Sequence, residues 1–98
     1  MEKFTSHCDL STVKAMVQAE KVRMTTTASI GAEALGLDFD GVIDIVMELT
    51  INDFYKSMTS YNDHRVWQDV YRPTTKVGKV YLKLIVINDV LIVSFKEL

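Results

Sequence analysis

The sequence predicts an α+β domain in which three N-terminal helices pack on one face of a mostly antiparallel sheet. In the first half of the chain, apolar residues recur at helical spacing, whereas from Asp53 onward apolar and polar residues alternate with period two. Helices followed by a run of strands are typical of this fold class. Because 98 residues suffice for one modest core, we expect a single domain over residues 1–98.

The first helix is expected after Asp9 or Ser11, since either side chain can cap a helix N-terminus. A short extended segment then covers 21–24. The apolar residues that would give this helix a buried face are Leu10, Val13, Met16 and Val17.

Two more helices are expected before residue 50. Thr25 to Thr27 favour a cap for a helix over about 28–35, which Gly36 would end. Asp40 would cap the third helix. Its apolar stripe consists of Val42, Ile43, Val46 and Leu49.

Four strands should follow as an antiparallel meander. Alternation covers 54–59 and 66–72, and Pro73 ends the second strand because it has no N–H for the ladder. The last two strands form a hairpin over 80–98. Asn88 and Asp89 favour a two-residue turn there, because both tolerate a left-handed backbone.

This turn sets the register of the hairpin. Leu82 would face Phe95 on an apolar face that belongs to the core, and Tyr81 would face Lys96 on the opposite face, called here the open face. The further pairs expected are Leu84–Val93 and Val86–Leu91 toward the core, and Lys83–Ser94 and Ile85–Ile92 on the open face.

Which residues of the first two strands lie beside Tyr81 on the open face depends on the lengths of two loops. A four-residue loop between the second and third strands would pair Gln68 with Tyr81, and a five-residue loop between the first two would pair Lys56 with Gln68. Lys56, Gln68, Tyr81 and Lys96 would then form one row across four strands. The sequence leaves both loop lengths open, and a slip of one residue would break the row.

Such a row suits cleavage of RNA without a metal. A ribose 2′-hydroxyl can attack the adjacent phosphate if one group takes its proton, another protonates the leaving oxygen and cations stabilise the phosphorane. Neighbouring lysines depress one another's pKa, and a tyrosine beside cations ionises more easily. Alternatively, a Tyr–Lys pair on a sheet serves only packing and solubility.

Charge differs between the two halves of the chain. Residues 1–52 hold 4 Lys/Arg against 8 Asp/Glu, and residues 53–98 hold 7 against 5, so the predicted sheet is the basic half. Four basic residues fall within twelve positions and suit phosphate contacts, or they protect a strand edge from pairing. They are Arg72, Lys76, Lys79 and Lys83.

Several other classes of site find no support. The single cysteine, Cys8, excludes an internal disulfide, and with His7 and His64 it lacks zinc spacing, so His7-Cys8 is expected in a loose N-terminal segment. Phosphate-loop motifs are absent. Neither a membrane span nor a signal peptide is visible. We therefore expect no metal, no cofactor, no membrane association and a cytoplasmic location.

Four segments are long and specific: GLDFDG at 36–41, DFYKSM at 53–58, WQDVYRP at 67–73 and DVLIVSFKE at 89–97. With them the chain resembles, nearly end to end, the motility quorum-sensing regulator toxins, which are mRNA interferases of bacterial type II toxin–antitoxin modules. The resemblance implies a microbial-ribonuclease fold related to the RelE-type toxins.

The resemblance also implies a function and partners. It implies ribosome-independent cleavage of single-stranded mRNA at GC-containing triplets such as GCU. It further implies neutralisation by a cognate antitoxin that has a zinc-binding N-terminal domain and a helix-turn-helix DNA-binding domain. A second hypothesis is a catalytically weak binding module that acts through its antitoxin in transcriptional autoregulation. Its partner could add a strand to the edge expected at 53–59.

The family's catalytic residues carry over onto Lys56, Gln68 and Tyr81, with Lys96 nearby, and these are the positions that strand parity brings together. Tyr81 would transfer a proton, with Lys56 or Lys96 lowering its pKa, and Gln68 would orient the ribose or phosphate. A departure from the family pattern is Asn88, where a histidine is expected. The expected RNA-binding residues are Met58, Arg72, Lys79 and Lys83.

Overall fold

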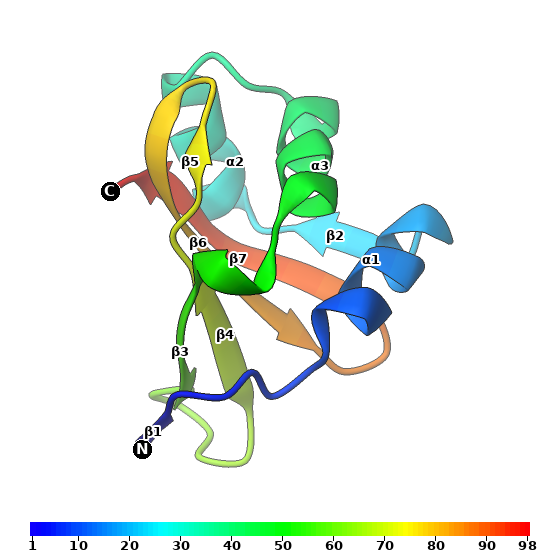
Figure 1. Cartoon of the computed structure of the whole chain (residues 1–98), viewed down its shortest axis with the longest axis vertical. Coiled ribbons are helices and arrows are strands. Elements are labelled where there is room, and N and C mark those ends of the chain that lie inside the picture. The colour runs from blue at the N-terminus through cyan, green and yellow to red at the C-terminus, as the bar shows by residue number, and fades with distance from the viewer.

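The computed structural model describes all residues, 1–98, and contains three helices and a seven-stranded sheet (Figure 1). The helices are α1 (Leu10–Gln18), α2 (Thr26–Ala34) and α3 (Phe39–Glu48), followed by a 3₁₀ turn at Ile51–Asp53. The strands are β1 (Glu2–Lys3), β2 (Val22–Met24), β3 (Phe54–Thr59), β4 (Trp67–Tyr71), β5 (Thr74–Thr75), β6 (Gly78–Val86) and β7 (Val90–Glu97). The α+β class is confirmed.

The sheet has the strand order β1-β3-β4-β6-β7-β2, with β5 paired to β6. All pairs are antiparallel except β2 with β7, so the expected meander forms and two N-terminal strands extend it at both edges. The expectation of an edge strand at 53–59 is wrong, because β1 pairs with the second half of β3 through Glu2–Met58 and Lys3–Ser57.

Helices α2 and α3 begin where a side-chain oxygen accepts from a free backbone N–H group, whereas Asp9, the N-cap residue of α1, makes no such bond. The Thr25 hydroxyl accepts from the Ala28 N–H at 3.1 Å, so α2 starts two residues earlier than expected. Asp38 caps α3 by accepting from the Gly41 N–H at 2.8 Å. The expected cap, Asp40, lies instead in the first turn of α3, where a carboxylate still favours the helix dipole.

One core joins all three helices to the sheet. Gly31 lets α2 lie directly against β7, because a Cβ at that position would overlap the carbonyl oxygen of Phe95. The buried core residues are Val13 and Val17 of α1, Ala28 and Ala32 of α2, Val42, Ile45 and Val46 of α3, Leu37, Leu49, Tyr71, Val80, Leu82, Leu84, Val90, Ile92 and Phe95. The open face of the sheet therefore carries the odd-numbered side chains of β6.

The β6–β7 hairpin follows the expected register only at its far end. Tyr81 pairs with Lys96 and Leu82 with Phe95, as predicted, but Val86 pairs with Val90 across a three-residue turn. The extra residue is absorbed by a bulge at Val93. Between the turn and the bulge, the side chains of β7 face the side opposite to the predicted one. The buried residues near the turn are therefore Ile92 and Val90 instead of Val93 and Leu91.

The turn is longer than predicted because β2 and the residue before it bind Asp89 and Val90, at the end of the turn. The Val90 N–H donates to the Lys21 carbonyl at 2.9 Å, and Arg23 binds Asp89 through two bonds of 2.5 and 3.3 Å. These contacts join segments far apart in the sequence, so the local turn signal of Asn88-Asp89 could not reveal them.

Both other loop lengths also differ from expectation. The turn between β5 and β6 is Lys76-Val77, because Thr75 pairs with Gly78 and lengthens the hairpin; the loop between β3 and β4 covers 60–66. The predicted single row is therefore wrong. Both shifts are even, so Lys56, Met58, Gln68 and Tyr81 keep their predicted face.

Candidate active site

The open face brings the predicted residues into a patch of three adjacent rows. In the central row Lys56 pairs with Val70, which pairs with Lys83. Met58 pairs with Gln68 in the row on one side. The row on the other side is Tyr81 with Lys96, and the register of β4 with β6 places Arg72 beside Tyr81.

Lys56 has a carboxylate partner that sequence reasoning missed. Its Nζ lies 2.6 Å from Oε2 of Glu2, which β1 brings across from β3. This hydrogen bond raises the pKa of Lys56, with a smaller opposing effect of desolvation. The expectation of a depressed pKa is wrong for Lys56, which is therefore a cation at neutral pH.

Lys83 behaves as expected of neighbouring lysines. Partial burial, and then the positive charge of Lys96, lower its pKa. Between Lys56 and Lys83 lies Val70, which is fully buried although it faces the open side. Long side chains therefore cover the sheet here, and their charged ends can reach a phosphate lying over it.

Tyr81 and Lys96 are cross-strand neighbours, as predicted, and the Lys96 Nζ lies 5.2 Å from the centre of the Tyr81 ring. The phenol is half-buried, whereas Lys96 is exposed. The register of β4 with β6 places Arg72 on the other side of Tyr81, so a basic residue lies beside the phenol on each neighbouring strand.

Two expected RNA-binding residues lie at the margin of this patch. The Arg72 guanidinium stacks on the ring of Tyr55, 3.6 Å from its centre, and is exposed. Lys79 pairs with Thr74, two residues from Tyr81 along β6, and is also exposed. Both can add positive field to the open face, but neither lies at its centre.

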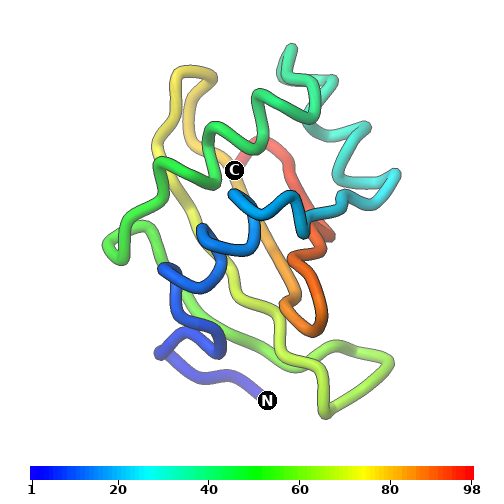
Figure 2. Tube along the Cα trace, turned by 90° about the vertical axis from the view of Figure 1, so that its right-hand side faces the viewer, coloured from blue at the N-terminus to red at the C-terminus, as the bar shows by residue number.

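A groove of about 680 Å³ adjoins the patch. The cross-strand pair Met58 and Gln68 lines it together with Lys83, and the loop 60–66 contributes Tyr61 and His64. Figure 2 shows this loop as a yellow-green tube that projects at the bottom of the molecule. Tyr61 was not predicted as a site residue, although an aromatic residue in a polar loop could have indicated one. The remaining lining residues are Met1, Thr59 and Ser60.

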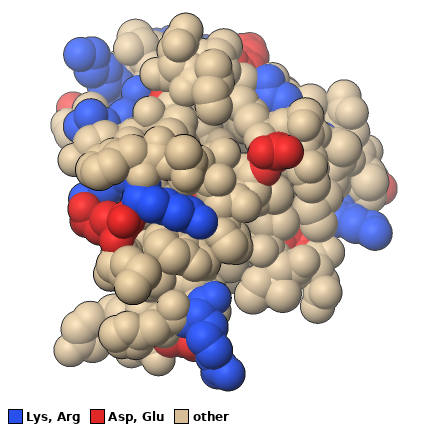
Figure 3. Space-filling view, turned by 60° about the horizontal axis from the view of Figure 1, so that its bottom comes forward, with Lys and Arg blue, Asp and Glu red and all other residues tan.

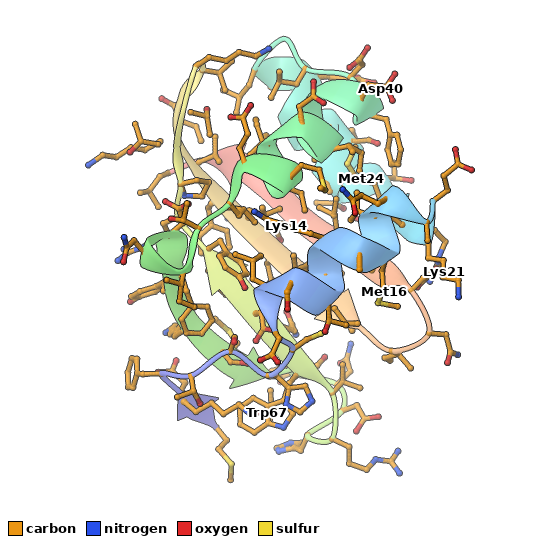
Figure 4. The ribbon with its side chains drawn as sticks, turned by 45° about the vertical axis from the view of Figure 1, so that its right-hand side comes forward. Lys14, Met16, Lys21, Met24, Asp40 and Trp67 are labelled. Carbon is orange, nitrogen blue, oxygen red and sulfur yellow. The ribbon has the colours of Figure 1, made fainter.

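The N-terminal segment is fixed against the sheet and is not loose as expected. The His7 and Cys8 N–H groups donate to the two carboxylate oxygens of Asp69, at 2.9 and 3.0 Å, and Asp69 is only 3% exposed. The His7 ring stacks on Trp67 with centres 5.7 Å apart, and Lys3 lies 4.1 Å from the Trp67 ring centre (Figure 4). This anchoring holds β1, and with it Glu2, beside Lys56.

The comparison with known proteins agrees with these observations. The family model described as the motility quorum-sensing regulator, toxin of MqsA, matches residues 5–97. The chain belongs to this toxin family. A curated relative, the mRNA interferase toxin MqsR of Escherichia coli (strain K12), is 59% identical over 97 residues, which cover 99% of each chain. The family resemblance noted from four segments is confirmed.

Asn88, where the resemblance leads us to expect a histidine, lies away from Tyr81 in this toxin family member. Asn88 belongs to the turn after β6, whereas Tyr81 lies near the start of that strand, roughly 20 Å away at about 3.3 Å per residue. Asn88 lines a separate depression with Lys21, Arg23 and Asp89. The side chain at position 88 is therefore remote from the Tyr81–Lys96 pair.

On the face of this toxin family member that Figure 3 presents, basic and acidic side chains are interspersed among uncharged atoms. No helix is long and apolar enough to cross a bilayer. His, Cys, Asp and Glu side chains form no group of three or more that could hold a metal ion. The electrostatic field at the open face is set locally by a few lysines, and this field would act on a nucleic acid that approaches that face.

Proposed function

We propose that this protein is the toxin of a type II toxin–antitoxin module and that it acts as an mRNA interferase in the cytoplasm. The observation that carries the proposal is the open-face patch, where Lys96 is the cross-strand neighbour of Tyr81 and where Lys56 and Gln68 lie on the same face of β3 and β4. Family membership and the name of the relative support it. We further propose that residues 1–98 form a single toxin domain with a RelE-like fold.

The proposed reaction is cleavage by the ribose 2′-hydroxyl without a metal. The 2′-oxygen bonds to the adjacent phosphorus, the bond to the 5′-oxygen breaks, and the products are a 2′,3′-cyclic phosphate and a 5′-hydroxyl. Tyr81 is the proton-transfer group. The ammonium groups of Lys56 and Lys96 stabilise the negative charge of the phosphorane, and Gln68 orients the ribose or phosphate through its amide. Lys56 suits the cationic role because Glu2 raises its pKa.

We propose single-stranded mRNA as the substrate, cleaved without ribosomes at GC-containing triplets such as GCU. The second partner is an antitoxin with a zinc-binding N-terminal domain and a helix-turn-helix DNA-binding domain. Both come from the toxin family, whose description names an antitoxin. The open face carries a few lysines, which suits a short stretch of single strand better than a long duplex.

The test is cleavage of a short GCU-containing RNA by purified protein in EDTA without ribosomes, with the product ends identified. Replacing Tyr81 by Phe should lower the rate by about 10²–10⁴, the usual contribution of proton transfer. Tyr71→Phe is the matched control, because the Tyr71 hydroxyl is buried in the core without a hydrogen-bond partner. This control should cleave normally.

A folded, antitoxin-free protein that leaves the RNA intact would contradict the proposal. Adding ribosomes would then separate a ribosome-dependent nuclease from the binding-module alternative. A Tyr81→Phe variant as active as the unmodified chain would exclude proton transfer by Tyr81 while leaving the nuclease activity itself in place.

A further inference from the structure

The groove beside the catalytic patch has the chemistry of a nucleobase site. Its volume of about 680 Å³ falls within the range of about 300–1,000 Å³ that is usual for small-molecule sites. Met58 and Gln68 are cross-strand partners that line it together with Lys83, and Tyr61 and His64 belong to the loop beside it. No carboxylate lines the groove. A flat, neutral ring attached to a phosphate would find apolar, aromatic and cationic groups here.

Tyr61 is the residue of this groove that no structural role explains. Its side chain is 95% exposed, so it adds nothing to the core. Its hydroxyl makes no hydrogen bond, and its ring stacks on no other ring. An exposed aromatic residue on a braced loop beside a groove is placed where it can contact a ligand in that groove.

The loop that carries Tyr61 is braced. The Ser60 N–H donates to the Val66 carbonyl at 2.8 Å, which closes the base of the loop. Asp63 accepts from the Arg65 N–H at 2.9 Å and from its Nε at 3.1 Å. These bonds order the loop before any ligand arrives, so stacking on Tyr61 would cost less conformational entropy than stacking on a disordered segment.

We propose that Tyr61 stacks on the nucleobase of one nucleotide adjacent to the scissile phosphate, with Met58 against the same base. This inference rests on the proposed function, because it places the RNA phosphate over the lysines of the open face. Stacking on aromatic side chains is a general means of binding unpaired bases, and Met supplies an adaptable apolar contact. Tyr61 thus holds one base beside the patch and helps to position the RNA backbone over the lysines.

The experiment measures binding of a GCU-containing RNA whose cleavage-site nucleotide carries a 2′-deoxyribose and so cannot be cut. Tyr61→Ala should weaken the Kd by about 5- to 150-fold, the range of base–aromatic stacking. Tyr61→Phe, which keeps the ring, should bind within about twofold of the unmodified protein. Phe39→Ala is the matched control, because Phe39 is another exposed aromatic residue, placed on α3, and it should leave the Kd unchanged.

A double-mutant cycle then locates the base. Abasic nucleotides are introduced one at a time on each side of the cleavage site, and each RNA is bound to the protein with Tyr61 and with Tyr61→Ala. At one position, the combined protein and RNA changes should weaken binding by less than the sum of the two separate losses of binding free energy, because both changes remove the same contact. Additive losses at every position, or a Tyr61→Ala protein with unchanged Kd, would overturn the stacking proposal. Because the readout is binding, this result is independent of whether the unmodified RNA is cleaved.

Discussion

At the scale of single residues, the most consequential contact is the one between Glu2 and Lys56. The folded protein binds the Lys56 proton more tightly than the unfolded chain does, because Glu2 accepts its hydrogen bond. The pair therefore favours the folded state below the ordinary lysine pKa, and this contribution is lost as pH rises through the raised pKa. The Glu2 carboxylate therefore competes with the RNA phosphate for the Lys56 ammonium group.

We expect Glu2→Gln to lower the pKa of Lys56 and to tighten RNA binding. The neutral amide oxygen accepts a weaker hydrogen bond from the ammonium group than the carboxylate does, and the substitution removes a negative charge from beside the phosphate. The Kd for the 2′-deoxy-substituted RNA should improve about two- to fivefold, as expected for an exposed ion pair. The Lys56 pKa is followed by NMR titration of its side-chain carbon, and binding by fluorescence anisotropy.

The control is Glu33→Gln, which removes the same charge from the exposed surface of α2. It should change neither quantity. A Lys56 pKa that stays at its raised value in Glu2→Gln would show that the contact with Glu2 is not its cause.

The residue scale also shows why the sequence predicted the face on which each proposed catalytic residue lies but not its neighbours. Alternation of apolar and polar residues along β3, β4 and β6 fixes which side each residue faces, because one side is buried. Lys56 and Gln68 were thus placed correctly on the open face, but in the wrong row. Loop lengths depend on local bonds such as Thr75 Oγ1 to the Gly78 carbonyl, at 2.8 Å, which periodicity does not encode.

At the scale of elements, the N-terminal segment depends on a single buried side chain. Asp69 binds two backbone N–H groups of that segment, at His7 and Cys8, and it projects from β4 on the face opposite the lysines. The sequence did not predict this because β1 has only two residues and its partners lie more than 50 positions away. A two-residue strand is too short to show the period-two alternation of apolar and polar residues by which strands are recognised in a sequence.

We expect Asp69→Ala to lower the free energy of unfolding by about 2–4 kcal/mol, because two backbone donors lose charge-assisted hydrogen bonds in a buried site. The thermal midpoint should fall by roughly 8–20 °C at a few degrees per kcal/mol. Urea unfolding at pH 7 measures the change. Asp44→Asn, at an exposed position on α3, is the control and should stay within about 0.5 kcal/mol. A loss below 1 kcal/mol in Asp69→Ala would show that β1 is held by other contacts.

At the scale of the whole molecule, charge is distributed in a way that limits how RNA can bind. The chain has a net charge of −2, yet its C-terminal half is basic. The lysines of the open face therefore act as a local site on an acidic protein, and distant parts of an RNA chain gain little from the rest of the surface. Affinity should then depend on a few phosphates only.

This leads to a quantitative expectation for salt. The cations of the patch that carry an uncompensated positive charge are Arg72, Lys83 and Lys96; the Lys56–Glu2 ion pair has no net charge, so a phosphate that contacts Lys56 releases few counterions there. Three phosphate contacts by a single strand give a slope of log K against log salt of about −2, so affinity falls roughly 20-fold between about 50 and 200 mM salt. In Glu2→Gln the slope should steepen toward −3, because Lys56 then displaces counterions as well. Anisotropy titrations of the uncleavable RNA at several salt concentrations measure both slopes. A slope near −5 would mean that RNA runs over the whole basic half, and a slope near zero would mean that these cations do not contact phosphate.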